Sequence, residues 1–298
     1  MNPVNPVNPY VLGLRRGAVE LRQLLRSRKD FYSYLTTPLV FLAISYWRSG
    51  SDGPSGTAAG NAGTDGSGDA LTQLSLAGGI ASTVFMFGLM TVPQFLSGDR
   101  EDGTLLRLRG VPGAMPAYLV AKALFVLVTM GASILLLLAG GALLLHADLP
   151  ATPGQWLTLA LTLLLGTAAV VPMGAAIGAL LPPAREALAL YMMPMLGLMF
   201  ISGAFAPLRD LPTALQAVGS VFPLRWIAQG VRSALLPDSA KALEVSGSWQ
   251  HPQITGVLLC WALAGFLLAP GLLRRMARKE SGSVLSERER KRLAKSAY

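Results

Sequence analysis

Charged residues are scarce in this sequence, and their scarcity argues against an ordinary soluble domain. Asp, Glu, Lys and Arg make up 14% of the 298 residues, whereas hydrophobic residues make up 52%. Soluble domains carry about 25% charged residues on average. The deficit predicts a membrane protein before any motif is considered.

Cysteine and histidine are almost absent, which limits the chemistry that the chain can carry. With Cys260 as the single cysteine, an intramolecular disulfide and a zinc site built on paired cysteines are both impossible. His146 and His251 fall at the edges of hydrophobic segments, and no nucleophile with a base or pair of carboxylates lies inside one. The G-x-x-x-x-G-K-[ST] string that binds ATP phosphates is also missing. We therefore expect no enzyme activity, no metal site and no cofactor bound by this chain.

Long hydrophobic runs are what the sequence does contain. A helix needs about 20 mostly apolar residues to cross about 30 Å of hydrocarbon. Six runs without Asp, Glu, Lys or Arg meet or approach this length. The fold class predicted is an all-α polytopic membrane protein with spans at about residues 31–47, 74–96, 123–145, 157–181, 187–206 and 254–273.

The distribution of Lys and Arg orients these spans. If the N-terminus is cytoplasmic, all 25 Lys and Arg residues fall inside except Arg48, Arg209, Arg225, Arg232 and Lys241. Such an excess on the cytoplasmic side is the normal positive-inside pattern. We expect both termini in the cytoplasm, a plasma-membrane location and no nucleic-acid partner, since topology accounts for most of the net charge of +9.

Both ends of the chain lie outside the hydrophobic runs. Residues 11–29 place apolar side chains on one helical face and Arg15, Arg22, Arg26 and Lys29 away from it, which predicts a helix in the inner interface, in contact with membrane lipids. We divide the chain into this cytoplasmic interface helix (1–30), a transmembrane domain (31–273) and a basic cytoplasmic tail (274–298). The Gly- and Ser-rich segment 49–69 predicts a flexible outside loop.

Two further segments have a pattern that topology does not require. Residues 99–109 run from acidic to basic, which suits a helix dipole, with Asp99 as the expected N-cap. Residues 208–235 have apolar side chains at steps of three and four, interrupted at Pro223, which predicts two short amphipathic helices. These two helices are too polar to span the membrane. We therefore expect them at the outer surface or dipping into the outer half of the membrane, as a lid or a structured loop.

Two local strings give the chain a resemblance to a known family. EDGTLLRLR at 101–109, followed by Pro112, Tyr118 and Lys122, resembles the E-x-G-T string and following Y-x-x-x-K of the permease subunits of type-2 ABC exporters. SGAFAPL at 202–208, followed by the Phe-Pro-Leu string at 222–224 and by Arg232, is similar to the element after their fifth span.

The resemblance implies a division of labour between subunits. Two permeases, identical or paralogous, would pair in the membrane, and each would dock on a cytoplasmic P-loop ATPase that binds ATP and Mg. Helix 11–29 and a coupling helix at 99–109 would form the docking site for the ATPase. The expected ATPase interface is Asp99, Arg100, Glu101, Asp102, Gly103, Thr104, Leu105, Arg107, Arg109, Arg22 and Arg26.

The same resemblance implies efflux of a drug, an antibiotic or a lipid-like compound. The chain lacks the extra domains of members that export long glycans, which favours a small amphipathic or hydrophobic substrate. Methionine and aromatic side chains suit variable apolar ligands, although in a span they also pack helices by default. The candidate substrate path is Phe85, Met86, Met90, Tyr191, Met192, Met195, Phe200 and Phe205.

Two other functions stay open at this point. An ion-coupled secondary carrier would place ionisable groups near the middle of its spans, where this sequence has none. Pro172 and Pro194 can kink two spans, but such kinks are common. A membrane scaffold without transport activity is compatible with the same pattern.

Overall fold

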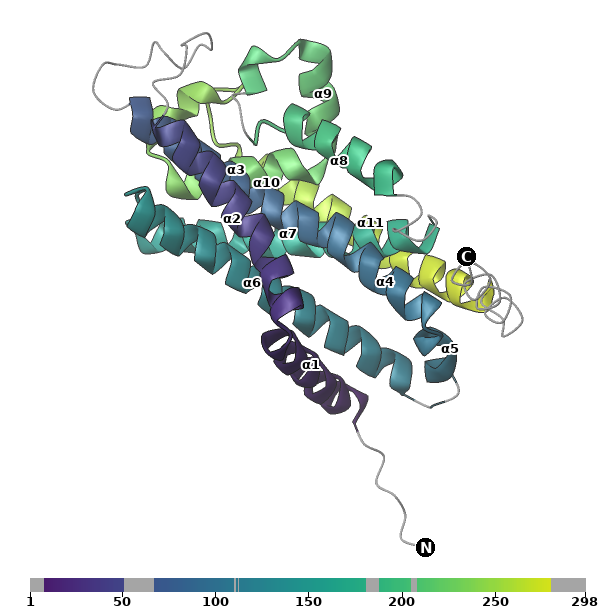
Figure 1. The fold of residues 1–298 in the computed structure, drawn as a ribbon. Coiled ribbons are helices and arrows are strands. Elements are labelled where there is room, and N and C mark those ends of the chain that lie inside the picture. The colour runs from purple at the N-terminus through teal and green to yellow at the C-terminus, as the bar shows by residue number, and fades with distance from the viewer. Residues whose placement is uncertain are drawn as a thin grey trace, which may run out of the picture.

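The computed structural model describes residues 8–50, 67–109, 111, 113–180, 188–204 and 208–279. Every regular element in these residues is helical, which confirms the all-α class (Figure 1). In chain order the elements are α1 Pro9–Arg26, α2 Arg28–Gly50, α3 Ser67–Met86, η2 Phe87–Thr91, α4 Val92–Glu101, α5 Thr104–Arg109, α6 Ala114–Leu144, α7 Pro153–Leu180, α8 Leu188–Ile201, η3 Leu208–Asp210, α9 Thr213–Val221, α10 Pro223–Leu235, η4 Asp238–Leu243 and α11 His251–Lys279.

The centre of the bundle is one continuous rod made of α3, η2 and α4. The turn η2 is a π-helix, in which the N–H of Val92 donates to the carbonyl of Phe87. Pro93 follows at once, and its ring displaces the preceding turn and removes a backbone donor, which accounts for the widened turn at this place. Single π turns inside α-helices are frequent at functional sites.

The other helices surround this rod. α2 and α6 pack on one side of it, α7 and α10 pack on the other, and α11 packs against α7 and α10 (Figure 1). Two glycines allow α7 to approach the rod closely, because Gly88 of η2 and Gly174 of α7 meet backbone to backbone and leave no room for a side chain. α8 lies at the edge, with Met193, Leu196 and Phe200 exposed.

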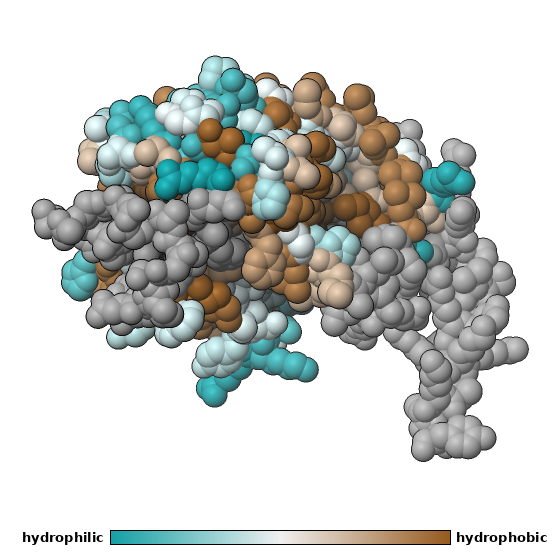
Figure 2. Space-filling model, turned by 90° about the horizontal axis from the view of Figure 1, so that it is seen from above, coloured by the Kyte–Doolittle hydropathy of each residue, from teal (hydrophilic) through white to brown (hydrophobic). Residues whose placement is uncertain are grey.

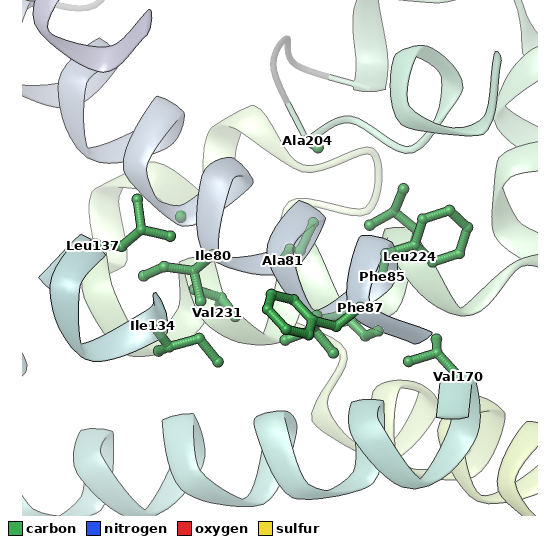
Figure 3. Close-up of a cluster of buried hydrophobic side chains, with 14 of the residues drawn as sticks. Ile80, Ala81, Phe85, Phe87, Ile134, Leu137, Val170, Ala204, Leu224 and Val231 are labelled. Carbon is green, nitrogen blue, oxygen red and sulfur yellow. The ribbon is translucent and has the colours of Figure 1, made fainter. Parts of the chain in front are cut away.

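A continuous apolar core joins these elements. Figure 3 shows Ile80 of α3 beside Ile134 and Leu137 of α6, with Val231 of α10 at the same level. Leu224, at the other end of α10, lies near Phe85 of α3. α3 and α10 therefore run in opposite directions along one another.

Much of the outer surface is also apolar, as a lipid environment requires. Leu135, Leu143, Leu164, Leu263 and Leu267 are all exposed. Hydrophobic side chains cover the middle of the face in Figure 2, and hydrophilic ones gather toward its left end.

Four stretches of the described chain are long and apolar enough to span a membrane: Thr72–Arg100, Ala114–Leu144, Pro153–Leu180 and His251–Leu273. The chain is thus a multi-pass membrane protein. The expected total of six spans, which adds α2 and α8, stays a prediction.

The segment after α8 is where the fold departs most from expectation. The break at Pro223 is confirmed, since α9 ends at Val221 and α10 begins at Pro223. Yet α10 does not lie at the surface, because all of its residues are buried. Small residues permit this burial: Ile227 packs onto Gly166 of α7, and Gly230 packs onto Thr162.

Candidate functional site

The end of α4 and the start of α6 hold the short helix α5 between two glycine turns. Gly103 has a φ of 67° and Gly113 a φ of 75°, a left-handed backbone that favours glycine. The expected single helix over 99–109 is therefore two helices, and Asp99 lies inside α4 rather than at an N-cap. The Glu-x-Gly-Thr string lies at the break between α4 and α5, with Gly103 in the turn and Thr104 as the first residue of α5.

A cluster of charged and aromatic side chains ties α1, α4 and α6 together beside this turn. Lys122 of α6 lies between two acids, with its Nζ atom 3.3 Å from Oε2 of Glu20 and 3.4 Å from Oδ2 of Asp99. The hydroxyl of Tyr118 donates to Oδ2 of Asp99 at 2.7 Å. Arg16 pairs with Glu20 at 3.2 Å and lies over the Tyr118 ring. We call these five residues the coupling cluster.

An apolar cluster continues from the coupling cluster toward α5. Leu96 of α4, Tyr118 of α6 and Met276 of α11 form its buried part. Leu108 of α5 packs against them, together with Ala179 of α7. Leu108 therefore joins α5 to a cluster whose members come from α4, α6, α7 and α11.

α1 reaches the coupling cluster because its glycines let it lie close to α6. Gly13 packs against Ala117 and Val120, and Gly17 packs against Ala121 and Leu124. This small-x-x-x-small spacing was the signal for the contact, and the apolar periodicity did not reveal it. Val11, Leu14 and Leu25 of the predicted apolar face are exposed, and the position of α1 in the membrane interface stays a prediction.

A comparison with known protein families shows to which family the chain belongs. Residues 57–270 match the family described as ABC-2 family transporter protein. The chain belongs to this family. No curated protein matches the sequence at a significant level. As an ABC-2 permease, the chain is a membrane transport subunit of the kind that works with a cytoplasmic ATPase subunit.

The residues expected to contact the ATPase divide into exposed and internal ones in this permease. Arg22 and Arg26 of α1 are exposed, as are Asp102 and Arg107 at the turn, where an Nη atom of Arg107 donates to the Asp102 carbonyl. Arg100 and Thr104 are half-buried, and Asp99 is held by Tyr118 and Lys122. The side chains of Glu101, Leu105 and Arg109 lie outside the described part of the chain.

The residues expected to line a substrate path lie in different surroundings. Phe85, Met90 and Met195 belong to the buried core, whereas Met86 and Met192 are half-buried beside it. Phe200 points outward with 74% of its surface exposed. The side chain of Tyr191 and all of Phe205 lie outside the described residues.

The sequence analysis missed a second polar group, which lies inside the permease on α10. Arg225, Gln229 and Arg232 are all buried, although topology counted both arginines among the outside residues. Arg232 forms an ion pair with Glu244 at 2.7 Å and donates to the Gly203 carbonyl at 2.7 Å. The steps of four and three from 225 to 232 were visible in the sequence, but they indicate a shared helix face and not its burial.

Proposed function

We propose that this ABC-2 permease is the transmembrane subunit of an ATP-driven exporter. It moves a small amphipathic or hydrophobic compound, such as a drug, an antibiotic or a lipid-like molecule, out of the cytoplasm or the inner leaflet. The observation that carries this proposal is the position of α5. Its charged side is exposed at Arg107 and the neighbouring Asp102, and its Leu108 contacts the apolar cluster shared with α4, α6, α7 and α11.

The partner in this proposal is a P-loop ATPase that binds ATP and Mg. It docks against α5 and the exposed arginines of α1. Each cycle of ATP hydrolysis then moves α5, which acts as the coupling helix. A second permease, either a copy or a paralogue, completes the transporter. α2 and α8 are the two further spans, which brings the total to six. Both termini then lie in the cytoplasm, and the protein lies in the plasma membrane.

Affinity purification of the tagged chain from its native membranes, in mild detergent, tests this function. We expect a P-loop ATPase in matching amount among the proteins identified by mass spectrometry. The Glu101→Lys/Asp102→Lys variant should reduce the co-purified ATPase about tenfold, because charge reversal at a docking surface introduces like-charge repulsion.

This variant should still insert into the membrane, since Lys near the C-terminus of α4 suits its helix dipole. Arg209→Glu reverses the charge of an exposed residue that is expected on the opposite side of the membrane. It serves as the matched control and should retain the ATPase. Recovery of the intact permease without any ATPase would instead favour a secondary carrier or a scaffold.

The orientation can be tested at Ser55, which lies outside the described residues. In a Cys260→Ser background, Ser55→Cys should react with an impermeant thiol reagent added to intact cells, since the Gly- and Ser-rich segment is expected outside. A cysteine at Ser27, between α1 and α2, should react only after lysis. The opposite pattern would reverse the topology.

A further inference from the structure

α10 carries a polar stripe into the interior of a membrane protein. Arg225, Gln229 and Arg232 lie on one face of this helix and are exposed by only 7%, 0% and 4%. α3, α7 and α11 pack around α10. Ionisable groups in such surroundings are expensive to bury and typically mark the route of a substrate or an ion.

The charges of this stripe do not balance. Glu244 pairs with Arg232, and both side chains are almost fully buried. In the described part of the chain, Arg225 forms no ion pair, its buried Nε atom has no hydrogen-bond partner, and its guanidinium lies 4.9 Å from the centre of the Trp226 ring. The acceptor atom Oε1 of Gln229 is also buried without a partner. One positive charge is therefore in excess, and a buried charge normally requires a partner.

The unpaired arginine lies deep in the bundle. Ile227 packs onto Gly166, near the middle of α7, while Gly230 packs onto Thr162, closer to the Pro153 end. Leu224 lies near Phe85 and Val170 at the same depth (Figure 3). No side chain caps the N-terminus of α10, so its first N–H groups add further positive potential beside Arg225.

The polar atoms around this stripe connect it to the surface. Gln229 donates to the Ser248 carbonyl at 3.2 Å, and Ser248 lines a surface hollow of about 610 Å³ together with Lys241 and His251. On α3, the hydroxyls of Ser75 and Ser82 are buried without partners. Gln229 thus links the polar stripe to the residues that line the hollow.

We propose that Arg225 binds the anionic head group, a carboxylate or a phosphate, of an amphiphile that the permease moves. A guanidinium offers paired donors that match both anions. This inference rests on the proposed transport function and names its substrate class. The anion can belong to a membrane lipid or to a smaller transported acid.

The test uses the full chain in phosphatidylcholine nanodiscs, with 11-(dansylamino)undecanoic acid and its neutral primary amide as fluorescent probes. We expect the acid to bind about tenfold more tightly than the amide, as a charge-assisted hydrogen bond would provide. Arg225→Gln should abolish this preference, and Arg225→Lys should retain part of it. Arg209→Gln, at an exposed arginine on the same side, should leave it unchanged.

Adding phosphatidylglycerol to the nanodiscs distinguishes the two sources of the anion. If it displaces the acid, a lipid phosphate is the ligand; if it does not, the ligand is a smaller acid. Equal binding of acid and amide, or a preference that survives in a folded Arg225→Gln variant, would overturn the proposal. Because these measurements need no ATPase, an acid preference without a co-purifying ATPase would reject only the exporter function.

Discussion

Replacing Lys122 by methionine is expected to detach α1 from α4 and α6 and to reduce the co-purified ATPase about tenfold, equivalent to about 1.4 kcal/mol of docking free energy. Lys122 contacts both Glu20 of α1 and Asp99 of α4. Its Nζ atom also lies 5.0 Å from the centre of the Phe95 ring. Methionine preserves the length and the packing but leaves two half-buried carboxylates without their shared cation.

Hydrogen–deuterium exchange provides a second readout of this variant. The amide groups of α1 should exchange faster in Lys122→Met, because a helix that loses its tertiary contacts opens more often. Lys122→Arg keeps the charge and should restore slow exchange and ATPase binding. Lys241→Met, which removes a half-exposed lysine near the surface hollow, should leave both measurements unchanged. Normal ATPase recovery from Lys122→Met would remove the coupling cluster from the docking mechanism.

The sequence was sufficient to predict the long helices because their signal is local. An uncharged apolar run such as 123–145 can only be stable in lipid as a helix, and α6 contains all of it except Leu145, which is the C-cap. The break between α9 and α10 was equally local, since Pro223 favours the first turn of a new helix.

The site was harder to predict because its contacts join distant parts of the chain. Asp99 fits the pattern of an N-cap, yet its carboxylate accepts a hydrogen bond from Tyr118 on a different helix. Arg232 fits the pattern of a solvent-facing residue, yet its partners Gly203 and Glu244 come from segments on either side of α10. An amphipathic pattern indicates that two faces differ, but not whether the polar face meets water or other buried polar groups.

The buried pair of Arg232 and Glu244 makes the strongest prediction for stability. Glu244→Gln should lower the free energy of unfolding by about 3–5 kcal/mol, the usual effect of removing one partner from a buried ion pair. The side chains of Arg232 and Glu244 are 4% and 3% exposed, so water cannot replace the lost carboxylate. Arg225 and Arg232 would then both lie on α10 without a counter-ion. Thermal unfolding of the detergent-solubilised chain, followed by circular dichroism, measures the change.

The sign of this effect depends on which charge is removed. Arg225→Gln removes a cation that forms no ion pair within the described residues, so it should leave the unfolding temperature equal or higher, whereas Glu244→Gln should lower it. Arg232→Met/Glu244→Leu removes both members of the pair and should recover most of the stability lost in Glu244→Gln alone. Asp238→Asn serves as the matched acid-to-amide control on an exposed side chain and should change little. If Glu244→Gln unfolds at the wild-type temperature, Glu244 does not neutralise a charge on α10. The excess positive charge would then belong to Arg225 and Arg232 together, and not to Arg225 alone.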